Sequence, residues 1–419
     1  MKILLIGTSD RKGGAAIASY RLFLSLKKRY KDIKMLVRDK LTSEEDIIGL
    51  NNTVSQKIFN SVRFIAERLM FFIYMKSKEL LFFFSPANTG QNILNYKEVK
   101  EADIIHLHWI NQAFISVNQL GKLFQSGKKV IWTMHDMWPF TGGCHYSGEC
   151  TNYHNECGNC PFLRTNSHKD LSYKVFKKKE KIYKEARRIT FVSPSIWLAE
   201  KARKSSLLSK FDIHVIPNPI DTEVFKPGIK SDVRKSLRLP EDDFLLLAGS
   251  ANIKEKRKGF TYLVEAMENM KERNPGIFKN IGLITFGKHS AVENLPVRVY
   301  PMAFLKNEKA LVEIYQAADL FILPSLEDNL PNLVIESLAC GTPVVAFNIG
   351  GMPEILDHKE TGYLGKPKNV DDIIEGINWI RLHPDLDELK AKCRKKILDR
   401  YSPEIVLEKY LTLYKDLLN

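Results

Sequence analysis

The sequence lacks any long apolar run. No stretch reaches the roughly 20 uninterrupted apolar residues that a membrane-spanning helix needs. We also expect no secretory leader, because Met1–Gly7 is too short an apolar run and is typical of a first β-strand. Only six cysteines occur in 419 residues, which argues against a disulfide framework. These absences together predict a cytoplasmic protein.

Basic residues are in excess. The chain has 63 Lys and Arg against 49 Asp and Glu, a net charge of +14. Such a balance favours anionic partners, among them a phosphorylated substrate, a membrane surface or nucleic acid. Charge is the only feature that favours nucleic acid, so we expect no such partner. Apolar residues make up 44% of the chain, which is an ordinary globular composition, and the length predicts two or three domains.

Short apolar runs alternate with helical patterns along most of the chain. This alternation predicts α/β domains, with parallel sheets covered by helices on both faces. The series restarts after the turn-forming stretch 217–219. We therefore expect one domain over 1–218, a second over 219–400 and a closing amphipathic helix over 401–419. The strands that we expect cover 2–7, 34–37, 103–108, 129–134, 189–193, 213–217, 244–249, 281–287, 319–324 and 343–347.

Two groups of residues in the first half follow expected strands, where open α/β sheets bind their ligands. Gly13 and Gly14 lie between the first strand and a helix, so small side chains and helix-start N–H groups could meet a phosphate. His135 also follows a strand and could donate to a sugar hydroxyl or phosphate, with Asp136 orienting it. An ordinary turn and a structural histidine are the alternative interpretations.

A third group lies in the second half, where Asp328, Asn329, Leu330 and Asn332 precede Glu336 in an expected helix. A loop with Asp, Asn and exposed backbone N–H groups suits hydroxyl and diphosphate recognition. A carboxylate further along the helix could bind a ribose through two hydroxyl hydrogen bonds. A capped surface helix would explain the Asn and Asp residues, but not the whole run.

The segment Pro324–Val345 resembles the signature of glycosyltransferase family 4, a retaining family with the GT-B fold. That signature places an acid eight positions before a Glu, then a small-residue helix and a Gly-Thr-Pro turn. Asp328 and Glu336 match the two acids, although the family has Glu at the first position. Residues 215–221 also resemble the family's interdomain passage.

The stretch from Gly249 to Gly259 resembles the family's phosphate-binding segment, with Lys258 as its lysine. Family members often carry Arg directly after the first of these glycines, but here Ser250 stands in that position. Either Lys256 or Arg257 would then supply the second basic group, and the sequence leaves this choice open.

The resemblance implies a GT-B fold: two doubly wound Rossmann-like domains with an interdomain cleft, the first binding the acceptor and the second the nucleotide sugar. It implies that Glu336 binds the ribose, Lys258 the diphosphate and Asp328 the donor sugar. The other residues that we expect at the donor are Gly13, Gly14, His135, Arg257, Asn329, Leu330 and Asn332.

The implied activity is metal-independent transfer of a sugar from a nucleotide-sugar donor, with retention of its anomeric configuration and without a catalytic cofactor. We expect a glycan or lipid-linked oligosaccharide as the acceptor, in cell-surface polysaccharide biosynthesis. A sugar-nucleotide epimerase of GT-B fold and a non-catalytic sugar-nucleotide-binding subunit are the alternatives.

Four of the six cysteines are clustered, at Cys144, Cys150, Cys157 and Cys160. The last two have the spacing of a zinc knuckle, and four thiolates form a closed tetrahedral site. A structural zinc ion is therefore one prediction. Reduced packing cysteines, and disulfides or a redox role, are the others.

A basic, aromatic stretch covers residues 57–86, and lysines recur over 174–184. Basic amphipathic helices of this kind can lie in a membrane interface, which would place the protein at the inner face of the cell membrane. An amphipathic helix that simply packs on a sheet has the same pattern. Both interpretations stay open at this stage.

Overall fold

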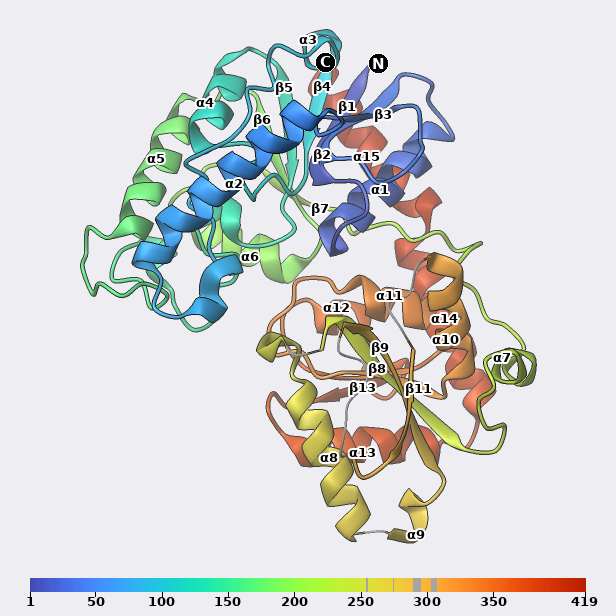
Figure 1. Ribbon diagram of the computed structural model, residues 1–419. Helices are drawn as coiled ribbons and strands as arrows, with labels where there is room; N and C mark the ends of the chain where they lie inside the picture. The colour runs from blue at the N-terminus through green and yellow to red at the C-terminus, as the bar shows by residue number, and fades with distance from the viewer. Residues whose placement is uncertain (254, 274, 289–294, 303–306) are drawn as a thin grey trace. The chain divides into compact units, whose positions relative to one another are not determined.

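The computed structural model describes residues 1–253, 255–273, 275–288, 295–302 and 307–419. The chain divides into two compact units, one formed by Met1–Asn218 with Leu407–Asn419 and the other by Pro219–Val406. Each unit contains one parallel sheet with helices packed around it (Figure 1). The predicted α/β class is confirmed.

The first unit has a sheet of seven strands in the order β3-β2-β1-β4-β5-β6-β7. The strands are β1 (Ile3–Ser9), β2 (Ile33–Asp39), β3 (Ile47–Gly49), β4 (Ile104–Leu107), β5 (Lys129–Thr133), β6 (Ile189–Ser193) and β7 (Ile213–Val215). The helices are α1 (Gly14–Lys27), α2 (Val54–Tyr74), α3 (Lys97–Glu101), α4 (Val117–Gln125), α5 (Leu171–Glu185), α6 (Ile196–Lys204) and most of α15 (Pro403–Leu418), with 3-10 turns η1 (Lys78–Phe82), η2 (Trp138–Phe140) and η3 (Asn152–His154).

Alternating residues of β4 show how this sheet is covered. Ile105 and Leu107 share a core cluster with Leu120 of α4, whereas His106 contacts the rings of α15. Since successive side chains of a strand point to opposite faces, α4 and α15 lie on opposite sides of the sheet. In Figure 1, α5 lies beside α4.

The closing helix is fastened to the first unit by buried hydrogen bonds. His106 Nδ1 lies 2.8 Å from the Tyr414 hydroxyl and His106 Nε2 lies 2.8 Å from Thr133 Oγ1, which in turn is 3.2 Å from the Tyr410 hydroxyl. Burial lowers the pKa of His106 to about 3. The imidazole is therefore neutral at pH 7, so one ring nitrogen donates and the other accepts.

The second unit has a sheet of six strands in the order β10-β9-β8-β11-β12-β13. The strands are β8 (Phe244–Asn252), β9 (Ile281–Lys288), β10 (Arg298–Pro301), β11 (Leu320–Leu323), β12 (Val344–Phe347) and β13 (Gly362–Gly365). The helices are α7 (Lys230–Ser236), α8 (Phe260–Arg273), α9 (Pro275–Phe278), α10 (Glu308–Ala317), α11 (Asn332–Ala339), α12 (Met352–Ile355), α13 (Val370–Arg381) and α14 (Leu386–Tyr401), with the 3-10 turn η4 (Lys256–Lys258).

Each sheet reverses its strand order at one place. The chain builds outward from β1 through β2 to β3, then returns to place β4 on the other side of β1. The second sheet does the same between β8 and β11. In open parallel sheets, ligands bind at the carboxyl ends of the strands that flank such a switch point. The two switch points therefore mark where a ligand site is expected in each unit.

Candidate functional site

Two loops meet at the switch point of the second unit. The loop after β8 carries η4 and ends at Gly259, whose φ of 67° is left-handed. A side chain there would place its Cβ 1.9 Å from the carbonyl oxygen of Pro324, so only glycine permits this approach. The backbone N–H of Leu326 also donates to the carbonyl of Arg257 at 2.8 Å. The loop after β8 is thus bound to the loop after β11.

These loops bring a lysine and a buried carboxylate together. Lys258 Nζ donates to Asp328 Oδ2 at 2.6 Å, and Arg257 Nη1 lies 3.7 Å from the same oxygen. Burial alone would raise the pKa of Asp328, but Lys258 and Arg257 outweigh it and lower that pKa below its usual value. The carboxylate is therefore ionised at neutral pH. Lys258 has three ammonium hydrogens, so it can also bind a phosphate oxygen.

The structure indicates which basic residue accompanies Lys258. Arg257 pairs with Glu255 at 2.9 Å and donates to the carbonyl of Glu327 at 2.6 Å, so its guanidinium is fixed beside Asp328. Lys256 is exposed. Arg257 is therefore the basic group that lies beside Lys258 and Asp328.

Glu336 is held inside the same unit, four residues after the start of α11 at Asn332. Its side chain is buried, and the Tyr315 hydroxyl donates to Glu336 Oε2 at 3.3 Å. Asn329 and Leu330 are buried in the loop that leads into this helix. All seven residues that the sequence predicts in this half therefore lie in the two loops or in α11.

A third loop closes against Asp328. Gly350 has a φ of 55°, and a Cβ there would lie 1.8 Å from the carbonyl oxygen of Asp328. The next residue, Gly351, donates its backbone N–H to that carbonyl at 3.4 Å. This contact fixes the backbone of Asp328, while Lys258 and Arg257 hold its carboxylate.

Two buried hydroxyls at this switch point have no hydrogen-bond partner among the described residues: Ser250 Oγ in β8 and Ser325 Oγ just after β11. Buried polar groups are ordinarily hydrogen-bonded, so a bound polar ligand would satisfy them. The sequence drew attention to Ser250 only as a departure from the family. The sequence analysis did not predict Ser325 as a site residue, although its position directly after a buried strand could have indicated it.

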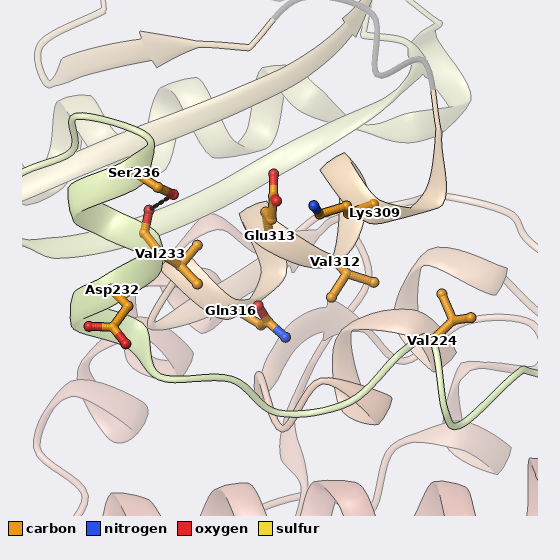
Figure 2. A pocket seen from close by; sticks show the side chains of 8 residues that line it. All are labelled: Val224, Asp232, Val233, Ser236, Lys309, Val312, Glu313 and Gln316. Carbon is orange, nitrogen blue, oxygen red and sulfur yellow. Dashed lines mark hydrogen bonds between the residues drawn. The ribbon is translucent and has the colours of Figure 1, made fainter.

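A separate pocket of about 430 Å³ lies elsewhere in the second unit. Figure 2 shows it between α7 and α10, with Val224 at its edge and the Ser236 hydroxyl bonded to the carbonyl of Val233. Its lining includes none of the predicted site residues, so it belongs to a different surface.

In the first unit the predicted residues also lie at the carboxyl ends of strands. Gly13 follows β1 and directly precedes α1, with a φ of 100° that strongly favours glycine; Gly14 is the first residue of that helix. His135 follows β5, and its Nε2 lies 3.0 Å from His108 Nδ1. Burial lowers the pKa of His135 to about 4, against the opposing effect of Asp136.

Asp136 is the centre of a buried network. Its carboxylate accepts hydrogen bonds from Trp109 Nε1 at 2.8 Å, from His145 Nδ1 at 2.8 Å and from the Trp138 backbone at 2.9 Å. Burial would raise the pKa of Asp136, but His145 and these bonds lower it overall. The carboxylate thus fixes the loop that carries His135.

Sequence analysis missed His108 and His145. His108 Nε2 is buried and has no partner in the part of the chain that the structure describes. His106 and His108 flank Leu107 at the end of β4, so their side chains lie on the same face of the strand. That spacing was the available signal for His108, whereas no sequence pattern indicated the contact between His145 and Asp136.

The four clustered cysteines line one small cavity of about 20 Å³. All four are free thiols, and burial raises the pKa of Cys157 to about 12 and of Cys160 to about 11. Among the described residues, no three His, Cys, Asp or Glu side chains converge in a geometry that could hold a metal ion. The zinc ion stays a prediction.

Two known families match the chain, one in each half. Residues 14–224 match the family described as Glycosyltransferase Family 4, and residues 230–399 match Glycosyl transferases group 1.

Individual relatives of known sequence share about a quarter of their residues with this chain over the aligned region. An uncharacterized glycosyltransferase of Methanocaldococcus jannaschii is 26% identical over 54% of this chain and 61% of its own length. The chain thus spans less than two thirds of that relative. WcaC of Escherichia coli, a glycosyl transferase whose name assigns it to colanic acid biosynthesis, is 23% identical over 75% of each chain.

Solved structures share the fold over almost the whole chain. Sucrose-phosphate synthase from Thermosynechococcus elongatus has a TM-score of 0.68 at 18% identity, covering 100% of this chain and 99% of that one. HepE of Anabaena, in complex with UDP and glucose, has a TM-score of 0.62 at 14% identity, covering 99% of both. The predicted GT-B fold is confirmed, and the chain belongs to glycosyltransferase family 4, within the group 1 glycosyl transferases.

Proposed function

We propose that this protein transfers a sugar from a nucleotide-sugar donor to a glycan or lipid-linked oligosaccharide acceptor in polysaccharide biosynthesis. The observation that carries the proposal is the arrangement at the second switch point, where Lys258, Asp328 and Glu336 are held by adjoining loops. The UDP complex of HepE supports a nucleotide-sugar donor, and the name of WcaC supports polysaccharide synthesis.

The chemistry follows from the charges. As the bond between sugar and diphosphate breaks, negative charge grows on the leaving diphosphate, and Lys258 with Arg257 would stabilise it without a metal ion. The sugar passes through an oxocarbenium-like state. Asp328, ionised by its basic neighbours, would accept hydrogen bonds from sugar hydroxyls, and Glu336 would accept them from the ribose.

The site of action that we propose is the cytoplasmic face of the membrane, where the protein would meet a lipid-linked acceptor. The six free thiols agree with a reducing compartment. None of the helices in the described part of the chain has the length and apolar character that crossing a bilayer requires.

Incubation with a panel of sugar nucleotides, with and without a lipid-linked acceptor, tests the activity. Transfer that requires the acceptor supports the proposal. Isomerisation of the donor without acceptor would instead identify an epimerase, and binding without turnover would identify a non-catalytic subunit.

We expect the transferred sugar to keep its anomeric configuration. An inverting transfer needs a general base whose pKa lies near the working pH, and His135, with a pKa of about 4, is a weak base at neutral pH. The leaving phosphate would take the acceptor's proton on the same face. NMR of the purified product gives the anomeric coupling, which is compared with that of the donor.

The His135→Ala variant supplies the control for this prediction. Retention, with measurable activity in the variant, agrees with a proton transfer that uses no histidine. Inversion, with complete loss of activity in the variant, would show that His135 is the base.

We also propose that the four cysteines hold one structural zinc ion. Their cavity has room for a single water-sized occupant, and the Gly142 backbone donates to Cys157 Sγ at 3.2 Å, which favours a thiolate. Lys179 is buried near Cys144 and Cys157, and its pKa is lowered to about 7 by burial, against the opposing effect of these cysteines. Binding would require the side chains to rotate from their free-thiol positions and to lose protons.

Metal analysis of protein purified without added zinc tests this. We expect about one equivalent of zinc per chain, as for one four-cysteine site, and release of that zinc by a chelator should make four thiols available to alkylation. Metal-free protein in which all four thiols react at once would contradict the zinc site.

A further inference from the structure

Helix α2 exposes an apolar surface along its whole length. Its 21 residues make it about 30 Å long, and Figure 1 shows it crossing the first unit as one long helix. Large apolar side chains with exposed fractions from 41% to 75% recur at spacings of three and four residues, which places them along one side. This α2 apolar face consists of Val54, Ile58, Phe59, Val62, Ile65, Leu69, Phe72 and Ile73, with Phe82 of neighbouring η1.

The buried side of α2 is largely polar, whereas an ordinary surface helix buries its apolar side. Asn60, Glu67 and Arg68 are buried there, and Phe71, which stacks on Phe84, is the only fully apolar residue among the buried ones in this helix. Arg68 pairs with Glu67 and donates to the carbonyl of Phe84 at 3.1 Å, and Gln91 donates to Asn60 Oδ1 at 2.7 Å. These specific bonds fix the orientation of the helix, so packing against its own unit does not account for the apolar face.

Charge indicates what covers this face. Glu67 is the one acid in α2 and is buried, whereas Lys57, Lys76 and Lys78 are exposed on and just beyond the helix. An exposed apolar stripe with basic residues beside it is typical of helices that lie in an anionic membrane interface. A second copy of the chain is a poorer partner, since each copy carries a net charge of +14 and like charges repel.

We propose that the α2 apolar face enters the headgroup region of an anionic bilayer, with Lys57, Lys76 and Lys78 contacting the lipid headgroups. The helix would lie in the plane of the membrane. Its role in reaching a lipid-linked acceptor rests on the proposed function, but binding to the bilayer does not. The surface would bring the unit that carries His135 to the membrane.

Sedimentation of the full chain with phospholipid vesicles, in the absence of donor and acceptor, tests the surface. We expect binding to vesicles of phosphatidylcholine with phosphatidylglycerol. The triple variant Ile58→Ser, Ile65→Ser, Leu69→Ser should bind about 1,000-fold more weakly, because burying each of the three side chains contributes roughly tenfold. The matched control is Ile229→Ser with Leu382→Ser, which removes equally exposed side chains from the second unit and should bind as the unmodified protein does.

A lysine variant separates charge from apolar contact. Replacing Lys57, Lys76 and Lys78 by Gln should weaken binding to the anionic vesicles and leave binding to phosphatidylcholine alone unchanged. Circular dichroism melting curves confirm that each variant is folded. Equal binding of the serine triple variant and the unmodified protein would overturn the proposal.

Sedimentation equilibrium tests whether a second copy of the chain, and not a membrane, covers the α2 apolar face. Suppose that the unmodified protein does not bind vesicles and forms a dimer, and that the serine triple variant abolishes this dimer. The α2 apolar face would then bind a second copy of the chain, and the membrane assignment would be overturned. Vesicle binding by a protein that transfers no sugar would support the membrane-binding role of the α2 apolar face and contradict the proposed transferase activity. The two proposals can therefore fail independently of each other.

Discussion

Replacing Lys258 by methionine is expected to lower kcat/KM by about 100- to 1,000-fold, the loss that follows removal of one preorganised donor to a developing anion. Lys258 is bonded to Asp328 at 2.6 Å, and the loop that carries it is fixed by the close approach of Gly259 to Pro324. The ammonium group is therefore in place before the diphosphate departs. Steady-state kinetics with the donor identified by the sugar-nucleotide panel measures the effect.

Lys256→Met is the matched control, because Lys256 lies in the same turn but is exposed. Its kinetics should be close to those of the unmodified enzyme. Loss of Lys258 leaves the Asp328 carboxylate with Arg257 at 3.7 Å, so a thermal melt must first show that the variant is folded. A folded Lys258→Met enzyme with unchanged kcat/KM would remove this lysine from the mechanism.

Replacing Glu336 by alanine is expected to weaken nucleoside diphosphate binding roughly 100-fold, since two hydrogen bonds to a carboxylate contribute about 1.5 kcal/mol each. The side chain is buried and already bonded to Tyr315, so its carboxylate is held in place to accept the two ribose hydroxyls that we propose. Isothermal titration calorimetry with the preferred nucleoside diphosphate measures the change. Glu327→Ala, one residue before Asp328, is the control and should bind normally.

A second ligand makes this result specific to the ribose. The unmodified protein should prefer a ribonucleoside diphosphate to its 2′,3′-dideoxy analogue, and Glu336→Ala should lose that preference. If the variant is folded and still discriminates between the two ligands, Glu336 does not contact the ribose.

The sequence predicted the interior of both sheets but missed three of the four edge strands. All ten strands that we expected exist, whereas β3, β10 and β13 were missed. Each has only three or four residues and lies at an edge of its sheet. An edge strand has one neighbour and less burial, so its apolar pattern is short, and no periodicity distinguishes it from a loop.

Asp328 and Glu336 were predictable as a pair because they share one stretch of sequence. In the structure, Asp328 lies in the loop after β11 and Glu336 lies in α11, the helix that follows this loop. Tyr315, which holds Glu336, was less accessible, because it lies in α10 and meets Glu336 only in the folded unit. The same holds for His145, because no sequence pattern links it to Asp136 on the other side of η2.

Helix α2 shows a different limit. Its amphipathic pattern predicted a helix, but periodicity alone cannot tell which side faces the core. The side that is buried carries Glu67 and Arg68, whose mutual charge compensation makes their burial tolerable. Only the identity of those buried partners shows that the apolar side is the outer one.

The bonds between β4 and α15 affect the order in which the protein can be completed during synthesis. Residues 1–218 are translated before the second unit, but the hydroxyls that contact His106 and Thr133 belong to Tyr414 and Tyr410, which follow it in the sequence. Nascent domains generally fold as units from the N-terminus. Here part of the interior of the first unit stays open until α15, which follows the whole of the second unit, has been translated.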